Sequence, residues 1–250
     1  MKIGCCGSWK EVHLYAELGF DYIEPAVEQV IDDNSFQQLV EQTSKYGLKA
    51  EAFNCLLPAS LPVVGPDVDL EAVRKYLEKA FPRIASLGGE IVVFGSGRAR
   101  KIPPEYPQAA AEKQILDFLE LAAEVADANK LKVVIEPLNK KQTNTMNNVA
   151  DARKVCAQVN WRVGLLADLF HVTAENEPFT NLEPVGELSH IHIPFPEEAF
   201  DTETFIGILK SHGYDKRISL EDNGGLRART APEEWGQVLA DTLRYLREVR

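Results

Sequence analysis

The chain has 250 residues and a mass of 27.9 kDa, with 45% hydrophobic and 26% charged residues. This composition is typical of a globular enzyme and excludes disordered, collagen-like and low-complexity proteins. Lys and Arg total 27 against 38 for Asp and Glu, a formal net charge of −11, which argues against nucleic acid or an anionic membrane as a main partner.

Short β-branched runs alternate along the chain with longer amphipathic stretches. The runs predict eight strands, at residues 2–5, 22–24, 49–53, 90–94, 132–136, 163–168, 190–193 and 217–221. The stretches predict seven helices, at residues 8–18, 35–46, 70–87, 108–129, 149–159, 202–211 and 232–249. After the sixth strand we expect acidic, Pro-containing sequence around residues 175–187, with only a short turn, in place of a clear helix.

Regular alternation of strands and helices is typical of parallel βαβ units. Eight strands with seven or eight helices favour a single (β/α)8 TIM barrel over residues 1–250, rather than a doubly wound sheet. Helix ends with left-handed caps are predicted at Gly19, Gly47, Gly88 and Gly213. Helix N-caps are predicted at Asp33, Asp69 and Thr230.

Two connections are longer than usual for such units, residues 54–68 after the third strand and 95–107 after the fourth. Both belong to the face on which barrels place their sites. The second contains Arg98, Arg100 and Lys101, which form either a clamp for a phosphate or carboxylate of the substrate or a solvated loop. We predict Arg98 as a substrate-binding residue. The aromatic and aliphatic residues near these strand ends form either an apolar wall over the substrate or simple core: Trp9, Phe53, Leu56 and Phe94.

Polar residues stand where four consecutive strands end. Glu136, Asp168 and Glu221 close the fifth, sixth and eighth strands, and the seventh contains His190 and His192. An ionised carboxylate at the end of an apolar strand is costly unless it is paired, hydrogen-bonded or bound to a cation. In a closed barrel these strand ends form an arc round one mouth, so the side chains converge.

Three carboxylates and an imidazole suit a divalent ion such as Mn²⁺, Mg²⁺ or Co²⁺, with Zn²⁺ as a further candidate. The alternative is a set of unrelated salt bridges at the rim, but basic partners are scarce in these segments. His190 and His192 share one face of their strand. We predict His192, nearer the mouth, as the ligand and His190 as a buried hydrogen-bonding residue. His171, three residues after Asp168, is predicted to contact substrate, with a structural loop role as the alternative.

These residues resemble the xylose-isomerase-like barrel superfamily of sugar isomerases and epimerases. The motifs Glu-Pro-Leu-Asn at 136–139, Asp-x-x-His at 168–171 and His-x-His at 190–192, followed by Glu221, occur in the order typical of D-tagatose 3-epimerase and hydroxypyruvate isomerase relatives. The resemblance implies that one metal ion is bound by Glu136, Asp168, His192 and Glu221. It also implies that Glu136 and Glu221 form an acid/base pair. It further implies substrate contacts from His171, Asn139 and the pocket-lining acid Glu24 at the end of the second strand.

Two departures from this pattern concern the substrate. Ketose 3-epimerases usually follow Glu-Pro-Leu-Asn with an Arg and then a Glu, whereas this chain has Lys140-Lys141-Gln142. They also have an Arg shortly after the seventh-strand His, whereas this chain continues Pro194-Phe195-Pro196. Both departures argue against a simple epimerase of free ketoses and leave the barrel and the metal site unaffected.

The difficult step in sugar isomerisation or epimerisation is removal of a proton α to a carbonyl. A divalent cation stabilises the developing negative charge, and a carboxylate takes the proton. We therefore predict a metal-dependent isomerase or epimerase of a small sugar or sugar derivative. Three alternatives remain: a dehydratase of a keto-cyclitol or dehydroshikimate-like substrate, an apurinic-site endonuclease relative, and a binding module without turnover. Five His and the acidic charge argue against the endonuclease.

The four cysteines, Cys5, Cys6, Cys55 and Cys156, contain no Cys-x-x-Cys pair. They are expected to be free thiols in a reducing cytoplasm. We expect no secretory signal and no membrane span, because no stretch approaches the roughly 18 apolar residues of such a span. The expected partner is a small carbohydrate, and a homodimer or homotetramer is expected from the family resemblance.

Overall fold

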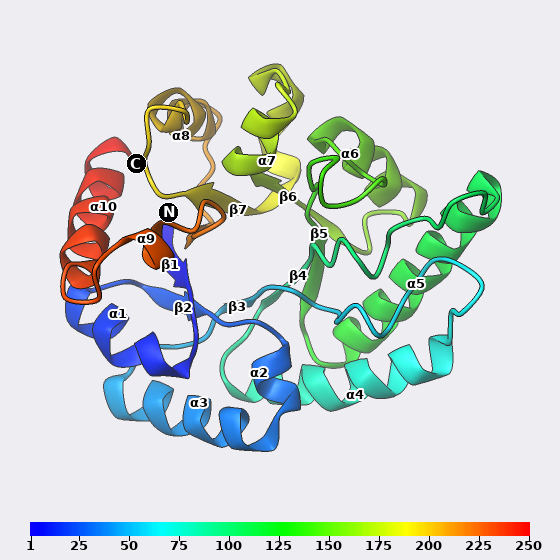
Figure 1. The fold of residues 1–250 in the computed structure, drawn as a ribbon, viewed down its shortest axis with the longest axis horizontal. Coiled ribbons are helices and arrows are strands. Elements are labelled where there is room, and N and C mark those ends of the chain that lie inside the picture. Colours follow the sequence, from blue (N-terminus) through cyan, green and yellow to red (C-terminus); the bar gives the residue numbers. More distant parts are fainter.

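The computed structural model describes residues 1–250 and consists of eight parallel strands arranged as a nearly closed barrel with helices around it (Figure 1). The strands pair in the order β2-β1-β8-β7-β6-β5-β4-β3. Two isolated parallel bridges, Ile23 with Ala50 and Ala26 with Asn54, connect the remaining two edges and close the ring. The predicted (β/α)8 TIM barrel is therefore confirmed.

All eight predicted strands are present, and six of them differ from the expected bounds by a few residues at their ends. Their bounds are β1 Lys2–Cys6, β2 Tyr22–Glu24, β3 Ala52–Phe53, β4 Ile91–Phe94, β5 Lys132–Ile135, β6 Gly164–Asp168, β7 Leu188–Pro194 and β8 Arg217–Glu221. The third strand is shorter than predicted, because Ala50 pairs with Ile23 only through one isolated bridge. The seventh is longer, since Leu188 already pairs with Leu165 of β6.

The helices are α1 Val12–Leu18, α2 Glu28–Ile31, α3 Asp33–Tyr46, α4 Leu70–Ser86, α5 Gln108–Ala128, α6 Val149–Gln158, α7 Leu169–Ala174, α8 Thr202–Ser211, α9 Leu226–Arg229 and α10 Trp235–Val249. Short 3-10 turns lie at Trp9–Glu11, Phe179–Leu182 and Val185–Glu187. The prediction of no clear helix after the sixth strand was wrong. Helix α7 begins directly after Asp168, whose Oδ1 accepts a hydrogen bond from the backbone N–H of Phe170 at 2.9 Å.

The predicted left-handed helix caps are confirmed: Gly19, Gly47, Gly88 and Gly213 all have positive φ. Asp69 caps α4, as expected, by accepting from Glu71 and Ala72. Asp33 was the wrong cap, because Asp32 accepts from the backbone of Ser35 at 2.7 Å and Asp33 is already helical. The prediction of Thr230 as an N-cap was also wrong. Thr230 ends α9, and its hydroxyl donates to the carbonyl oxygen of Leu226 rather than capping α10.

The two ends of the barrel differ in character. At the end where the strands begin, Glu51 pairs with Lys2 and Arg217, each at 2.7 Å, and closes the interior. Above these ion pairs, apolar side chains fill the barrel: Tyr22, Ala52, Ile91, Val93, Val134 and Leu166. The polar residues at the opposite end therefore rest on a packed floor. No helix of the structure has the length and apolarity needed to cross a membrane.

Candidate active site

Four of the predicted site residues meet at the end of the barrel where the strands finish. Glu136 follows β5 directly, Asp168 ends β6, His192 lies in β7 and Glu221 ends β8. Each offers a ligand atom within 4.8 Å of those of the other three. Glu136, Asp168 and His192 are buried and Glu221 is partly exposed. The barrel topology thus brings together side chains that are 85 residues apart along the chain at the extremes.

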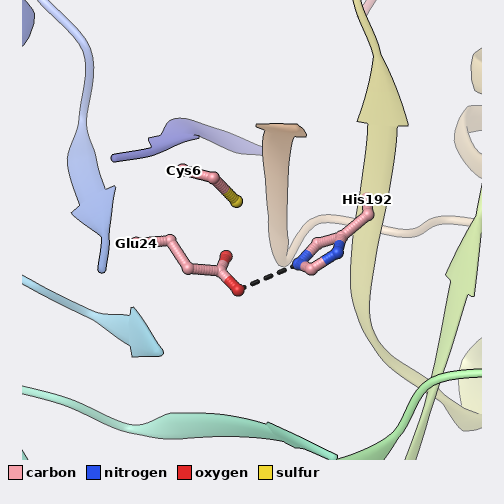
Figure 2. A group of neighbouring side chains, drawn as sticks. All are labelled: Cys6, Glu24 and His192. Atoms are coloured by element: carbon pink, nitrogen blue, oxygen red, sulfur yellow. Dashed lines mark hydrogen bonds and ion pairs between the residues drawn. The ribbon is translucent and has the colours of Figure 1, made fainter. Parts of the chain in front are cut away.

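His192 lies at the centre of this group. Its Nδ1 is 3.2 Å from Oε1 of Glu136 and 3.1 Å from Oε2 of Glu221. Its other nitrogen, Nε2, is 2.9 Å from Oε1 of Glu24 (Figure 2). Burial opposes a charge on the ring, but the charges of Glu24 and Glu221 raise the pKa of His192 well above its ordinary value. The ring therefore lies between three carboxylates, with Nε2 facing Glu24 and Nδ1 facing Glu136 and Glu221.

Asp168 forms a longer contact with an imidazole, 3.5 Å between its Oδ2 and Nε2 of His171. Its Oδ2 accepts a hydrogen bond from the side-chain amide of Asn223 at 3.0 Å, and the same amide donates to Glu221 at 2.9 Å. Burial and the neighbouring charges of Glu221 and Glu136 raise the pKa of Asp168 well above its ordinary value. No Lys or Arg side chain forms an ion pair with Glu136, Asp168 or Glu221. The group therefore has more negative charge than the imidazole alone balances.

This donor set fits a divalent cation. Carboxylate oxygens and one imidazole nitrogen are ligands for Mn²⁺, Mg²⁺, Co²⁺ and Zn²⁺. Nδ1 of His192, between the carboxylates of Glu136 and Glu221, is the place where positive charge is most favourable. A second group, Cys6, Glu24 and His192, also lies within 4.8 Å (Figure 2). It fits less well, because burial and then the charge of Glu24 raise the pKa of the Cys6 thiol and keep it protonated.

Glu24 does not line the pocket as the sequence predicted. It is fully buried beneath the carboxylate group. Its Oε2 lies 2.8 Å from Nε2 of His190 and also accepts from the hydroxyl of Ser219. Tyr22 extends this network, with its hydroxyl 2.7 Å from that of Ser219. The expected contact of Glu24 with substrate is therefore wrong in position, since Glu24 holds the two histidines from below. His190 is buried and hydrogen-bonded, as expected.

A cavity of about 430 Å³ opens above the group. Both long connections contribute to it, as expected, through residues 55, 57–59 and 95–99. Glu136, Glu221 and His171 line it from the strand ends, together with Asn223. Of the two alternatives for these aromatic and aliphatic residues, simple core is correct, because Phe53, Leu56 and Phe94 are buried in the core and Trp9 packs against it. The apolar lining comes instead from neighbouring residues: Leu57, Pro58, Tyr76 and Leu138.

His171 lines this cavity, whereas Asn139 does not. Nδ1 of His171 accepts from the backbone N–H of Asn139 at 3.2 Å and lies 2.9 Å from its side-chain nitrogen. Two donors at Nδ1 put the ring proton on Nε2, which lies 3.5 Å from Oδ2 of Asp168. The geometry therefore gives Asn139 the task of orienting His171, in place of the predicted contact with substrate.

The basic residues of the loop after β4 do not form one clamp. Arg98 lines the cavity. Arg100 is fully buried, donates from Nη2 to the backbone carbonyl of Glu136 at 2.7 Å and lies over the ring of Phe94. Burial lowers the pKa of Arg100 to about 10. Lys101 is exposed and lies outside the lining.

Sequence reasoning missed Asn223 as a site residue. Its position two residues after Glu221 places it at the same mouth, which is the signal the sequence offers for it. Gln142 and Glu28 also line the cavity without having been predicted. Neither belongs to a strand end, so no signal of the kind used for the carboxylates was available.

Comparison with known proteins gives a consistent result. The family model described as xylose isomerase-like TIM barrel matches residues 12–249. The 3-dehydro-D-guloside 4-epimerase of Escherichia coli (strain K12) is 24% identical over 185 residues, covering 69% of this chain and 70% of that protein. The probable ketose 3-epimerase of Synechocystis sp. (strain ATCC 27184 / PCC 6803 / Kazusa) is 26% identical over 254 residues, covering 92% and 86%. The crystal structure of the IOLI protein with a binding zinc atom superposes with a TM-score of 0.79 at 20% identity, covering 97% of this chain and 96% of that one.

Proposed function

Because the chain belongs to the xylose isomerase-like TIM barrel family, we propose that it is a divalent-metal-dependent isomerase or epimerase of a small sugar or sugar derivative. One observation carries the proposal. Glu136 and Glu221 both line the cavity and approach Nδ1 of His192, at 3.2 and 3.1 Å. Two carboxylates at the floor of one cavity are the groups that removal and return of a proton requires. The curated relatives are sugar epimerases.

Glu136, Asp168, His192 and Glu221 would hold the ion. When bound, the ion supplies stabilisation of the negative charge that develops on the substrate oxygens. Candidates are Mn²⁺, Mg²⁺, Co²⁺ and Zn²⁺, and a zinc atom is present in the crystal structure of the IOLI protein. Glu24 supports the site from below, since its carboxylate receives Nε2–H of His192 and leaves Nδ1 directed at the other ligands.

In this proposal the protein residues carry the proton transfers. One of Glu136 and Glu221 takes the proton from the carbon next to the carbonyl. The other, in its acid form, returns a proton from the opposite side. Return to the same carbon inverts it, which is epimerisation. Return to the neighbouring carbon, together with transfer of the hydroxyl proton from one substrate oxygen to the other, is isomerisation. His171, with its proton on Nε2, donates a hydrogen bond to a substrate oxygen.

Solvent isotope incorporation tests this function. The purified protein is analysed for bound metal, loaded with Mn²⁺ and incubated with ketoses, ketose phosphates and keto-glycosides in deuterated buffer. We expect one deuterium at the inverted or newly formed C–H position, read by NMR and mass spectrometry. A product lighter by one water would show a dehydratase instead. Absence of both exchange and product across the panel would leave only a binding function and refute the proposal.

The location and assembly of the enzyme are part of the same proposal. Cys5, Cys6, Cys55 and Cys156 are all free thiols, which suits the reducing cytoplasm. The expected homodimer or homotetramer stays a prediction, which sedimentation of the purified protein would test.

A further inference from the structure

The loop after β4 holds a cation without a partner. The sequence has twelve arginines, and eleven of them use the guanidinium in an ion pair or a hydrogen bond. Arg98 alone has neither, and it is exposed and lines the cavity. It is also the only Lys or Arg among the lining residues, whose other charged members are Glu28, Glu136 and Glu221.

The backbone of the same loop offers further donors. The N–H groups of Gly95, Ser96, Gly97 and Arg98 have no acceptor within the protein, whereas those of Ala99 and Arg100 both donate to the carbonyl oxygen of Ser96. Ser96 has a left-handed backbone, with φ of +36°, and its Oγ accepts from the backbone of Leu57 at 2.8 Å. Successive free N–H groups in a turn of this kind form a concave site for an anion.

The position of the loop leaves its far end for the substrate. A Cβ added to Gly95 would lie 2.2 Å from Oε2 of Glu136, so the near end of the loop already packs against that carboxylate. Gly97 and Arg98 lie further along and line the same cavity. A chain with a net charge of −11 repels anions at long range. An unpaired guanidinium beside free N–H donors gives the cavity a local site of opposite sign.

We propose that residues 95–98 form an anion subsite and that the molecule bound in this cavity carries a carboxylate or a phosphate. The anionic group binds at the loop after β4, on the side of the cavity away from β8. The inference rests on the proposed function for the reaction that follows binding, but the binding itself can be measured without turnover.

Three polyols without a reactive ketone test the subsite: D-glucitol, D-glucitol 6-phosphate and D-gluconate. Their affinities are measured by calorimetry on the Mn²⁺-loaded protein. We expect at least one of the anionic probes to bind more tightly than D-glucitol. The Arg98→Gln variant should weaken that probe about 10- to 100-fold, the usual loss for hydrogen bonds to a charged group. Tight binding of only one anionic probe identifies phosphate or carboxylate as the group recognised.

Lys101→Gln is the matched control, because Lys101 is an exposed cation of the same loop that lies outside the cavity. It should leave all three affinities unchanged. Equal affinity of the wild type for all three probes would overturn the inference, and so would equal losses in Arg98→Gln and Lys101→Gln. Should Arg98→Gln fail to fold, Arg98→Lys is used instead, because it keeps the charge and removes the paired donors. Its affinity for the anionic probe should be lower than that of the wild type, by less than the loss of about 10- to 100-fold expected for Arg98→Gln. Absence of turnover with every sugar would refute the proposed function and leave the anion subsite unaffected.

Discussion

Glu24→Gln tests whether Glu24, at the floor of the cavity, prepares His192 for the proposed metal ion. The Glu24 carboxylate serves two imidazoles at once, His192 at 2.9 Å and His190 at 2.8 Å. Glutamine has the same size but only one acceptor oxygen, and its amide nitrogen donates. One histidine therefore faces a donor in place of an acceptor. The site is fully buried, so water cannot replace the lost bond.

For His192 the consequence is a change in which nitrogen carries the proton. A ring that accepts at Nε2 must hold its proton on Nδ1, the nitrogen that faces Glu136 and Glu221. A protonated Nδ1 cannot bind a cation. Loss of an outer partner of a metal-binding histidine typically lowers metal affinity about 10- to 100-fold. At about 1.4 kcal/mol per tenfold, this corresponds to roughly 1.4–2.8 kcal/mol of binding free energy.

The assay is calorimetric titration of the metal-free protein with Mn²⁺ at one buffered pH. Glu51→Gln is the control, since Glu51 is also a buried acid but pairs with Lys2 and Arg217 at the closed end of the barrel. It should lower the melting temperature and leave Mn²⁺ affinity unchanged. Glu24→Asp keeps the charge on a shorter side chain, and its Mn²⁺ affinity should lie between those of the wild type and Glu24→Gln. Wild-type affinity in a folded Glu24→Gln variant would refute the reasoning.

The remaining predictions concern turnover, packing and stability. Glu136→Gln and Glu221→Gln, each assayed at saturating Mn²⁺, should lose about 100- to 10,000-fold in kcat with an unchanged circular dichroism spectrum; normal turnover in either would remove that residue from the mechanism. Gly95→Ala should cost about 1–3 kcal/mol in urea unfolding and reduce activity, because its Cβ would meet Oε2 of Glu136 at 2.2 Å. Gly207→Ala, in α8 with no atom within 4 Å of the new Cβ, should instead stabilise by about 0.5–1 kcal/mol; equal effects would contradict the packing argument. Mn²⁺ at about 100 times its Kd should stabilise by about 2.7 kcal/mol, raising Tm by roughly 5–10 °C, and an unchanged Tm after chelation would argue against a resident ion.

The fold could be predicted because most strands are short, largely apolar runs separated from amphipathic helical stretches by glycine or polar residues. The ring of eight strands follows from the alternation of strands with helices along the chain. The structure differs from the predicted bounds mainly at the ends of strands and helices. Helices α2 and α9, at Glu28–Ile31 and Leu226–Arg229, were missed because four residues contain no full period of hydrophobic spacing. Asp32 was passed over for Asp33 because two adjacent aspartates are equally good caps in sequence and only the backbone turn distinguishes them.

The convergence of the four candidate ligands was also within reach, since parallel strands in a barrel end at one mouth. Depth was not. Glu24 ends β2 just as Glu221 ends β8, yet Glu24 is fully buried and Glu221 keeps 20% of its side chain exposed. Whether a strand-end side chain lies above or below its neighbours depends on the stagger of the strands, which spacing does not report. Asn139 shows the same limit, because its orientation toward His171 is set by the loop.

The cavity draws its parts from two halves of the barrel. The four convergent polar side chains come from β5 to β8, whereas the walls above them come largely from the connections that follow β3 and β4. Altering residues 57–59 or 97–98 therefore changes what the cavity accepts and leaves the chemistry beneath it in place. Because the two sets of residues are separate, substrate specificity can be engineered by a library confined to those few loop positions, with the strand-end side chains left unchanged.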